Sequence, residues 1–403
     1  MSRWKYPFIG LFMNVLLGTI YSWSVFRRPL EEMCGWTDLE SCLPFSVFIF
    51  FFAATMPLGG YLINRVGPRK TALLGAVLVG GGWVASSLAV NLPNSLLMTL
   101  IFYGVVAGSG VGLVYGVPIS VSSKWIPDRK GVAIGITVLG FGLSPLITAP
   151  LATYMILNYG VSQTMATLGI AYALLLTILS LPMKLPPPGW RPSVAEQIKV
   201  KIHSEMTAKQ MLWTRLFYSL WVSYFLGTMG GFIAISMSAK YGVEVVGMSP
   251  EMAAFSTGIF AVFNGGGRVL FGYLTDNIGI RTAAMMSFTA LFVASLLALA
   301  SSSAPFFLLS FSLFWLVFGG WLAMAPNATS TFFGLKNLGL NYGIVFTAYG
   351  ASALIGPPLA EYLEDVTDST QALFLTITVI SITGAILASR LKPERIAVEK
   401  ITG

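Results

Sequence analysis

The chain alternates long apolar runs with short polar segments, and each run is about as long as a bilayer is thick. A hydrocarbon core of about 30 Å takes about 20 residues of helix to cross. Backbone groups in lipid need partners within a helix or a closed barrel, and the roughly ten-residue alternating strands of a barrel do not occur here. The pattern therefore predicts an all-α membrane protein with twelve transmembrane helices, at 6–26, 43–64, 71–90, 96–122, 132–156, 162–183, 214–239, 252–275, 283–302, 305–331, 340–362 and 370–390.

Composition agrees with this interpretation and excludes several classes of protein. Of the 403 residues, 55% are hydrophobic and only 10% are charged, and the mean hydropathy is +0.77. A soluble fold could not bury so much apolar surface, which excludes a soluble enzyme, a disordered protein and a nucleic-acid-binding protein. One histidine and two cysteines provide no basis for a zinc or iron–sulfur site, so neither a metal nor a cofactor is expected.

The basic residues predict the orientation of the chain in the membrane. If the N-terminus is cytoplasmic, 20 of the 24 lysines and arginines fall in cytoplasmic segments and three in outer loops. The net charge of +8 is then a topology signal and not a patch for nucleic acid. Both termini are expected in the cytoplasm. The first span lacks a cleavage site and is expected to be retained. Cys34 and Cys42 both fall in the expected first outer loop, where they either form a disulfide or remain two thiols.

An internal repeat divides the chain into two halves. The longest polar stretch, 184–213, is expected to be a cytoplasmic linker between six-span bundles at 1–183 and 214–403. A pattern Gly-x-x-x-Asp/Asn-x-x-Gly-x-Arg follows the second span of each half, at an offset of 212 residues. The first copy contributes Gly60, Asn64, Arg65, Gly67 and Arg69, and the second contributes Gly272, Asp276, Gly279 and Arg281.

With this loop motif, the chain resembles the major facilitator superfamily of transporters. The resemblance implies two pseudo-symmetric six-helix bundles around a central substrate site, which rock between inward-open and outward-open states. It also implies a gating role for the loop motif. Asn64 stands where many members have Asp, which is expected to weaken the gating role of the first copy.

Arg268 is the one charged residue well inside an expected span. An arginine at mid-membrane costs about 2.5–3.5 kcal/mol on insertion scales and normally has a cavity or a partner. Three interpretations stay open: a side chain that reaches the headgroups, one held by backbone carbonyls, and a cation that binds an anionic substrate. The last is favoured because a guanidinium matches a carboxylate with two parallel hydrogen bonds. Asn264, one turn earlier, is expected on the same helix face.

Further residues resemble the oxalate/formate antiporter family and, more distantly, bacterial and other monocarboxylate transporters. They are Tyr21-Ser-Trp-Ser-Val, Gly110-Val-Gly-Leu-Val-Tyr115-Gly, Trp125-Ile-Pro-Asp-Arg-Lys-Gly131, Phe263-Asn264-Gly-Gly-Gly-Arg268 and Asn341-Tyr-Gly343. The resemblance implies an anion-binding arginine at Arg268 and an aromatic cage at Tyr115, Phe141 and Phe318. Tyr21, Phe346 and Tyr349 are the other expected substrate-binding residues.

Two departures from these families narrow the expected substrate. Tyr349 stands where the oxalate transporter has a second cation, a lysine, so one fixed positive charge is expected to favour a monoanion. Asn264 stands where the monocarboxylate transporters have an aspartate that resembles a proton carrier, and their lysine on the first span is absent. Their proton route therefore cannot be copied onto this chain.

The sequence predicts a secondary active transporter that moves a small monocarboxylate such as lactate, pyruvate or formate, with proton symport by analogy. The alternative within transport is exchange of oxalate and formate or of another dicarboxylate. A ligand sensor without transport is a different class, and an enzyme is disfavoured because no acid–base or covalent machinery lies in the spans. The expected partners are a small carboxylate anion, a proton and membrane lipid. The chain is expected to work as a monomer in the bacterial inner membrane.

Overall fold

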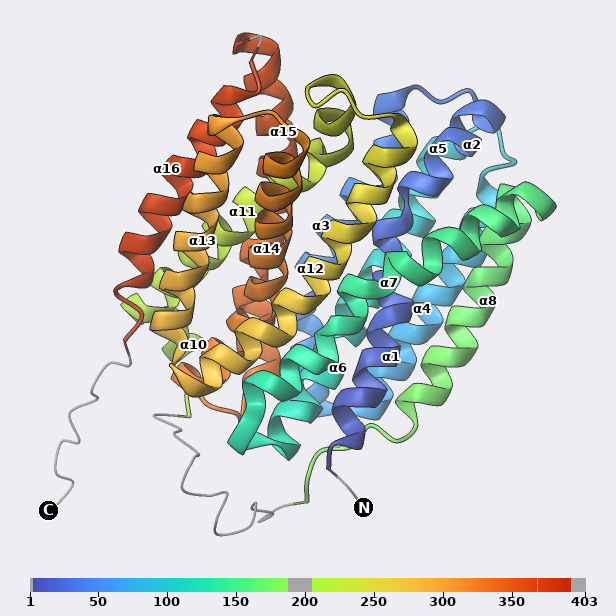
Figure 1. The fold of residues 1–403 in the computed structure, drawn as a ribbon. Helices are drawn as coiled ribbons and strands as arrows, with labels where there is room; N and C mark the ends of the chain where they lie inside the picture. The colour runs from blue at the N-terminus through green and yellow to red at the C-terminus, as the bar shows by residue number, and fades with distance from the viewer. Residues whose placement is uncertain (1–2, 188–204, 368, 393–403) are drawn as a thin grey trace, which may run out of the picture.

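The computed structural model describes residues 3–187, 205–367 and 369–392 (Figure 1). Residues 188–204 of the expected linker, with His203, lie outside this range. The first half contains α1 (Lys5–Leu17), η1 (Gly18–Ser22), α2 (Ser24–Cys34), α3 (Asp38–Arg65), α4 (Pro68–Ala89), α5 (Ser95–Thr99), η2 (Leu100–Ala107), α6 (Gly108–Trp125), η3 (Pro127–Arg129), α7 (Lys130–Tyr159) and α8 (Val161–Ser180). The second half contains α10 (Ala208–Leu212), α11 (Arg215–Glu244), α12 (Pro250–Asn277), α13 (Ile280–Ala300), α14 (Ala304–Phe333), α15 (Leu338–Thr367) and α16 (Gln371–Ala388).

Every one of the twelve expected spans falls on helix in this all-helical fold. Ten of the helical segments within the described ranges are long and apolar enough to cross a membrane by themselves, and an eleventh crosses if the bent α1–η1–α2 segment is one span. The segment missing from that set is α12, although it is 28 residues long. Its apolar residues are diluted by Arg268 and by glycine and polar residues, so the least apolar span is the one that carries the buried cation.

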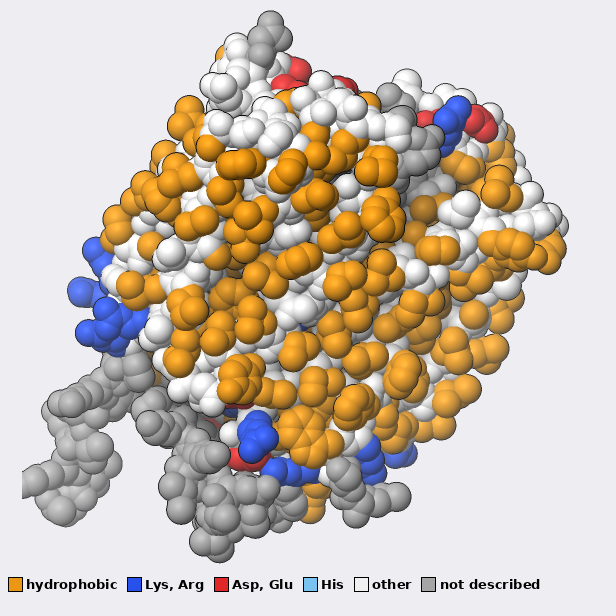
Figure 2. Space-filling view, in the orientation of Figure 1, with side chains coloured by type: hydrophobic (Ala, Val, Ile, Leu, Met, Phe, Trp, Pro, Cys, Tyr) orange, Lys and Arg blue, Asp and Glu red, His pale blue; other side chains and the backbone are white. Residues whose placement is uncertain are grey.

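The surface has the distribution of side chains that a bilayer requires. Large apolar side chains are exposed along the helices, for example Leu157, Leu174, Val293 and Val379. Figure 2 shows them over the middle of the molecule, with lysine and arginine gathered toward the lower end. We call this lower end, where α1 begins and α16 ends, the basic end, and the opposite end the acidic end.

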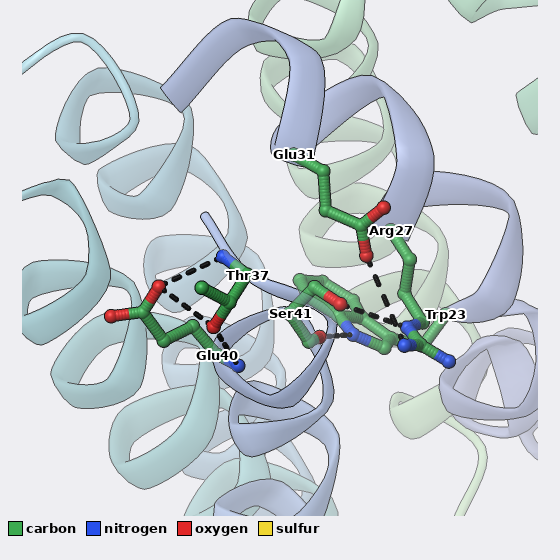
Figure 3. Close-up of polar contacts among 6 residues, drawn as sticks. All are labelled: Trp23, Arg27, Glu31, Thr37, Glu40 and Ser41. Atoms are coloured by element: carbon green, nitrogen blue, oxygen red, sulfur yellow. Dashed lines mark hydrogen bonds and ion pairs between the residues drawn. The ribbon is translucent and has the colours of Figure 1, made fainter. Parts of the chain in front are cut away.

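Helix extends beyond residue 26, where the sequence predicts the end of the first span: after a break at Trp23 and a bend of 46°, α2 continues to Cys34. Figure 3 shows what holds its outer part. The Trp23 indole nitrogen donates to the Ser41 carbonyl at 2.8 Å, and Arg27 donates to the Ser41 hydroxyl at 3.0 Å. Thr37 and Glu40 cap the start of α3 reciprocally. Cys34 and Cys42 are not joined by a disulfide in this structure.

The two halves meet along two helix pairs, α7 against α12 and α3 against α15. Glycines allow the close approach. A Cβ on Gly60 would overlap the backbone of Gly339, and one on Gly343 would lie 2.6 Å from Pro57. In the other pair, a Cβ on Gly131 would overlap the backbone of Gly272 in the same way. Because these contacts lie toward the basic end, that end of the structure is closed.

The loop motif forms the same turn in both halves. Gly67 and Gly279 have φ of +88° and +82°, values at which a side chain would be strained. Each directly precedes the first residue of a helix, Pro68 in one half and Ile280 in the other. The repeat that the sequence indicates therefore corresponds to a repeated backbone geometry.

Candidate anion-binding site

Arg268 is fully buried at the interface between the two halves, with a relative exposure of 0%. Its Nε donates to Asn264 Oδ1 at 3.1 Å, one turn earlier on α12. Its Nη1 donates to the carbonyl of Val138 on α7 at 2.7 Å. Its Nη2 is buried and has no hydrogen-bond partner. The Arg268 side chain does not reach the surface. A backbone carbonyl accepts a hydrogen bond from Nη1 but not from Nη2.

No carboxylate pairs with Arg268 in the part of the chain that the structure describes. An unpaired buried charge is costly because it has lost its hydration. The guanidinium therefore retains both the charge and an unused hydrogen-bond donor for an anion.

Glycines provide the space around this pair. A Cβ on Gly142 of α7 would lie 2.7 Å from Asn264 Oδ1 and 2.9 Å from Arg268 Nε. Within the triple glycine of α12, Gly265 packs against α7 and Gly267 against α14, whereas Gly266 faces open space. Close helix packing therefore explains two of these three glycines.

Aromatic side chains surround the guanidinium on the α7 side. Its Cζ lies 5.8 Å from the centre of the Phe141 ring, close enough for a cation–π contact. Tyr21 and Tyr115 both pack edge-on against Phe141, with ring centroids 5.2 and 5.3 Å away. The hydroxyls of both tyrosines lie close to Arg268.

The α15 side contributes Phe346 and Tyr349. Their rings stack at 4.8 Å, and the Tyr349 hydroxyl is 2.6 Å from that of Tyr21 across the interface. Phe346 also contacts Tyr115 at 5.5 Å. Phe318 is more remote: its ring lies 6.1 Å from that of Tyr349 and 4.8 Å from that of Phe232, and it does not contact the rings nearest Arg268. The structure thus gathers seven of the eight expected substrate-binding residues and places Phe318 at their edge.

Several residues of this cluster did not emerge from the sequence. Phe52 of α3 lies at its centre, within 5.0–6.3 Å of Tyr115, Phe141, Phe346 and Tyr349. Tyr224, Phe232 and Tyr342 border Phe346 and Tyr349. Aromatic residues are common in membrane helices, so Phe52, Tyr224 and Phe232 had no distinguishing signal. Tyr342 lies in the Asn341-Tyr-Gly343 stretch that resembles the antiporter family, but the sequence did not place it at the site.

The second copy of the loop motif joins the two halves at the basic end. Asp276 at the end of α12 accepts hydrogen bonds from the backbone nitrogens of Gly131 and Val132, both at 2.9 Å. These groups form the N-terminus of α7, which attracts negative charge. Asn327 of α14 donates to the same carboxylate at 3.3 Å.

The first copy makes no equivalent contact. Asn64 is exposed, and its side chain has no hydrogen bond within the described ranges. Arg65 lies over the ring of Tyr61 at 5.4 Å, and Arg69 and Arg281 are exposed. The side-chain contact across the halves is therefore asymmetric, although the backbone turn is repeated.

A hollow of about 410 Å³ opens at the acidic end, away from Arg268, and contains none of the expected site residues. Glu244 and Glu364 line it, and Lys240 bridges them at 4.0 and 2.9 Å. The hydrogen bond to Glu364 raises the pKa of Lys240 above its ordinary value. Among the described residues no group of three His, Cys, Asp or Glu is arranged to hold a metal.

A bundle of long apolar helices in two interlocking halves, with a buried cation between them, has the architecture of a multi-pass membrane transporter. The chain belongs to the Major Facilitator Superfamily, whose sequence profile matches residues 7–332 and 246–401.

Proteins similar to this chain include two that are named as transporters of organic anions. The oxalate:formate antiporter of Oxalobacter formigenes is 26% identical over 358 residues, which cover 88% of this chain and 83% of the antiporter. Monocarboxylate transporter 12 of Mus musculus is 27% identical over 79% of this chain and 70% of its own length. The transporter FucP in the outward conformation has a TM-score of 0.74 at 13% identity, over 97% of this chain and 100% of FucP, and supports the fold alone.

Proposed function

We propose that the protein moves a small monocarboxylate across the membrane by alternating access, and that the carboxylate binds Arg268. The observation that carries this proposal is a fully buried guanidinium with an unused Nη2 donor. Binding neutralises the charge and satisfies the donor, which lowers the cost of keeping the site closed to water. Asn264 orients the arginine, while Tyr115, Tyr21 and Phe141 enclose the anion.

The single cation supports a monoanion such as lactate, pyruvate or formate. Tyr349 and Phe346 offer a hydroxyl and an apolar face but no charge. A dianion at this site would leave its second carboxylate without a cation, which is costly away from water.

Proton symport is the proposed coupling mode. A lone anion that enters a negative-inside cell works against about 2.3 kcal/mol per 100 mV, and a proton that travels with it removes this cost.

The basic end is proposed to be cytoplasmic in a bacterial inner membrane, with both termini on that side. The closed basic end then makes this an outward-facing or occluded state.

Uptake of labelled lactate by proteoliposomes tests the site. Arg268→Ala is expected to lower the initial rate at least about a hundredfold, and Arg268→Lys at least about tenfold, because lysine keeps the charge but loses the planar fork. Arg28→Ala is the matched control, since that side chain is 87% exposed and should leave uptake unchanged. Wild-type rates in Arg268→Ala would refute the assignment.

The second candidate is oxalate/formate or another dicarboxylate exchange, which the similarity to the oxalate:formate antiporter favours. Uptake by the same proteoliposomes distinguishes monocarboxylate symport from dicarboxylate exchange. Under the leading proposal, formate and pyruvate compete with labelled lactate more strongly than oxalate does, and an imposed inward proton gradient accelerates uptake. Stronger competition by oxalate, with uptake that depends on internal anion, would favour exchange.

A further inference from the structure

The two described ends of the expected linker are anchored on equivalent turns of the two halves. At its start, the carbonyl of Lys184 accepts a hydrogen bond from the indole nitrogen of Trp125, where α6 ends, at 2.8 Å. At its other end, the carbonyl of Met206 accepts hydrogen bonds from Nδ2 of Asn337 and of Asn341, both at 3.1 Å, where α15 begins. The first turn follows the fourth expected span and the second follows the tenth, so the two occupy the same place in the repeat.

Glu205 binds the second of these turns, between α14 and α15, with its side chain. Its two carboxylate oxygens accept hydrogen bonds from the backbone nitrogens of Leu335 and Lys336, at 3.2 and 2.8 Å. The carbonyl of Lys336 accepts a hydrogen bond from Nζ of Lys124, which lies on α6 in the other half, at 3.4 Å. The turn is therefore bound by Glu205 on its own half and by a lysine from the opposite half.

The carboxylate of Glu205 also offsets positive charge at the boundary between the halves. Lys124 and Lys130 of the first half are both partly buried, and the charge of Glu205 acts on both of them. Asp276 is the other carboxylate that acts on Lys130. A partly buried lysine has lost some of its hydration and regains it when the halves separate, so a counter-charge on the opposite half favours the closed arrangement.

We propose that Glu205 is a latch for the basic end: anchored on the α14–α15 turn, its carboxylate attracts Lys124 and Lys130 of the other half and keeps this end closed. Opening of the basic end separates Glu205 from these lysines, because they belong to different halves. The strength of the attraction then controls how often the interior opens to this end, which is a different role from binding an anion at Arg268. Because Glu205 is exposed, dissolved salt weakens the attraction.

Cysteine labelling of the purified full chain tests this latch. Ile63 of α3 is buried against Gly339, close to the α14–α15 turn, so that Ile63→Cys becomes accessible when the basic end opens. With Cys34 and Cys42 replaced by serine, we expect Glu205→Gln to raise the rate of maleimide labelling at least about threefold. A change from about 0.01 M to about 1 M salt shortens the Debye length from about 30 Å to about 3 Å. It should accelerate labelling when Glu205 is present and have little effect in Glu205→Gln.

Glu32→Gln is the matched control, because it makes the same chemical change at an exposed carboxylate of the acidic end. It should change neither the labelling rate nor its salt dependence. A protein with both Lys124→Gln and Lys130→Gln tests the partners. In that protein, Glu205→Gln should add little further acceleration, because the charges that it attracts are gone.

Two results would overturn the latch: labelling of Glu205→Gln at the rate of the unchanged background, or equal acceleration by Glu205→Gln with and without the two lysines. Labelling needs no substrate, so either result would leave the anion-binding site at Arg268 intact. Loss of that site assignment by wild-type uptake in Arg268→Ala would likewise leave the latch standing.

Discussion

At the scale of single residues, the proposed site has room for the Arg268 and Asn264 side chains because residue 142 is a glycine. A Cβ on Gly142 would press against the ends of the Asn264 and Arg268 side chains and not against backbone. Gly142→Ala should therefore displace the guanidinium without preventing folding. We expect uptake to fall at least about tenfold, which corresponds to about 1.4 kcal/mol of lost binding, while the yield of folded protein is retained.

Gly266→Ala is the control for this variant, because Gly266 lies beside the same arginine on α12 but faces open space. Initial rates and size-exclusion profiles of both variants decide the matter. Equal rates in the two variants would show that the room left by Gly142 is not needed.

The sequence could predict the charged centre of the site but not its immediate surroundings. A guanidinium in an apolar run is conspicuous, and Asn264 follows from helical periodicity. The Val138 carbonyl that receives Nη1 is a backbone group on another helix, and nothing in the sequence marks it. Phe52 was not predicted for a related reason: in an apolar run, the sequence does not distinguish a phenylalanine that faces a site from one that faces lipid.

At the scale of elements, the two copies of the loop motif differ in one contact: the second copy joins the end of α12 to the start of α7. Asp276 accepts hydrogen bonds from two backbone N–H groups at the start of α7, which stabilises the closed basic end. Burial raises the pKa of this carboxyl, so the stabilisation comes from the hydrogen bonds rather than from the charge. Asp276→Asn keeps the shape but replaces one acceptor oxygen by an NH₂ group, so that one of the two hydrogen bonds is lost. We expect it to lower the thermal midpoint of the purified protein by a few degrees, from a loss of about 1–2 kcal/mol.

Asn64→Ala tests the other copy at the equivalent position. Since Asn64 is exposed and makes no hydrogen bond with the described residues, this change should leave the midpoint within error of the wild type. A loss of stability as large in Asn64→Ala as in Asp276→Asn would contradict the asymmetry. The sequence indicated this asymmetry only as Asp against Asn. The partner of Asp276 is a helix N-terminus that only the fold brings close.

At the scale of the whole molecule, hydropathy predicted the spans but not how they assemble. Apolar length alone locates a helix in a membrane, whereas the choice of neighbours depends on small residues whose partners lie far apart in sequence. The contact of Gly60 with Gly339 and that of Gly131 with Gly272 are of this kind. Continuation of the first span to Cys34 was missed because Arg27, Arg28 and Pro29 resemble the end of a span. These residues are nevertheless helical in the structure, where the Arg27 side chain of α2 is hydrogen-bonded to Ser41 of α3.

The glycine contacts between α3 and α15 make the closure of the basic end a property of the entire molecule. An alanine at Gly60 would overlap the backbone of Gly339, which cannot move as a flexible side chain can, so the helices themselves must separate. Gly60→Ala should therefore shift the population toward states open at the basic end. Ile63 reports on this, because its buried side chain lies against Gly339 of α15 and would become accessible when α15 moves away. In an Ile63→Cys background with Cys34 and Cys42 replaced by serine, we expect labelling by a membrane-impermeant maleimide, supplied from the basic end, to accelerate at least about threefold on addition of Gly60→Ala. Gly81→Ala, where a Cβ meets nothing, should leave the rate unchanged. Equal labelling in all three proteins would mean that the seam between α3 and α15 does not govern access to the site.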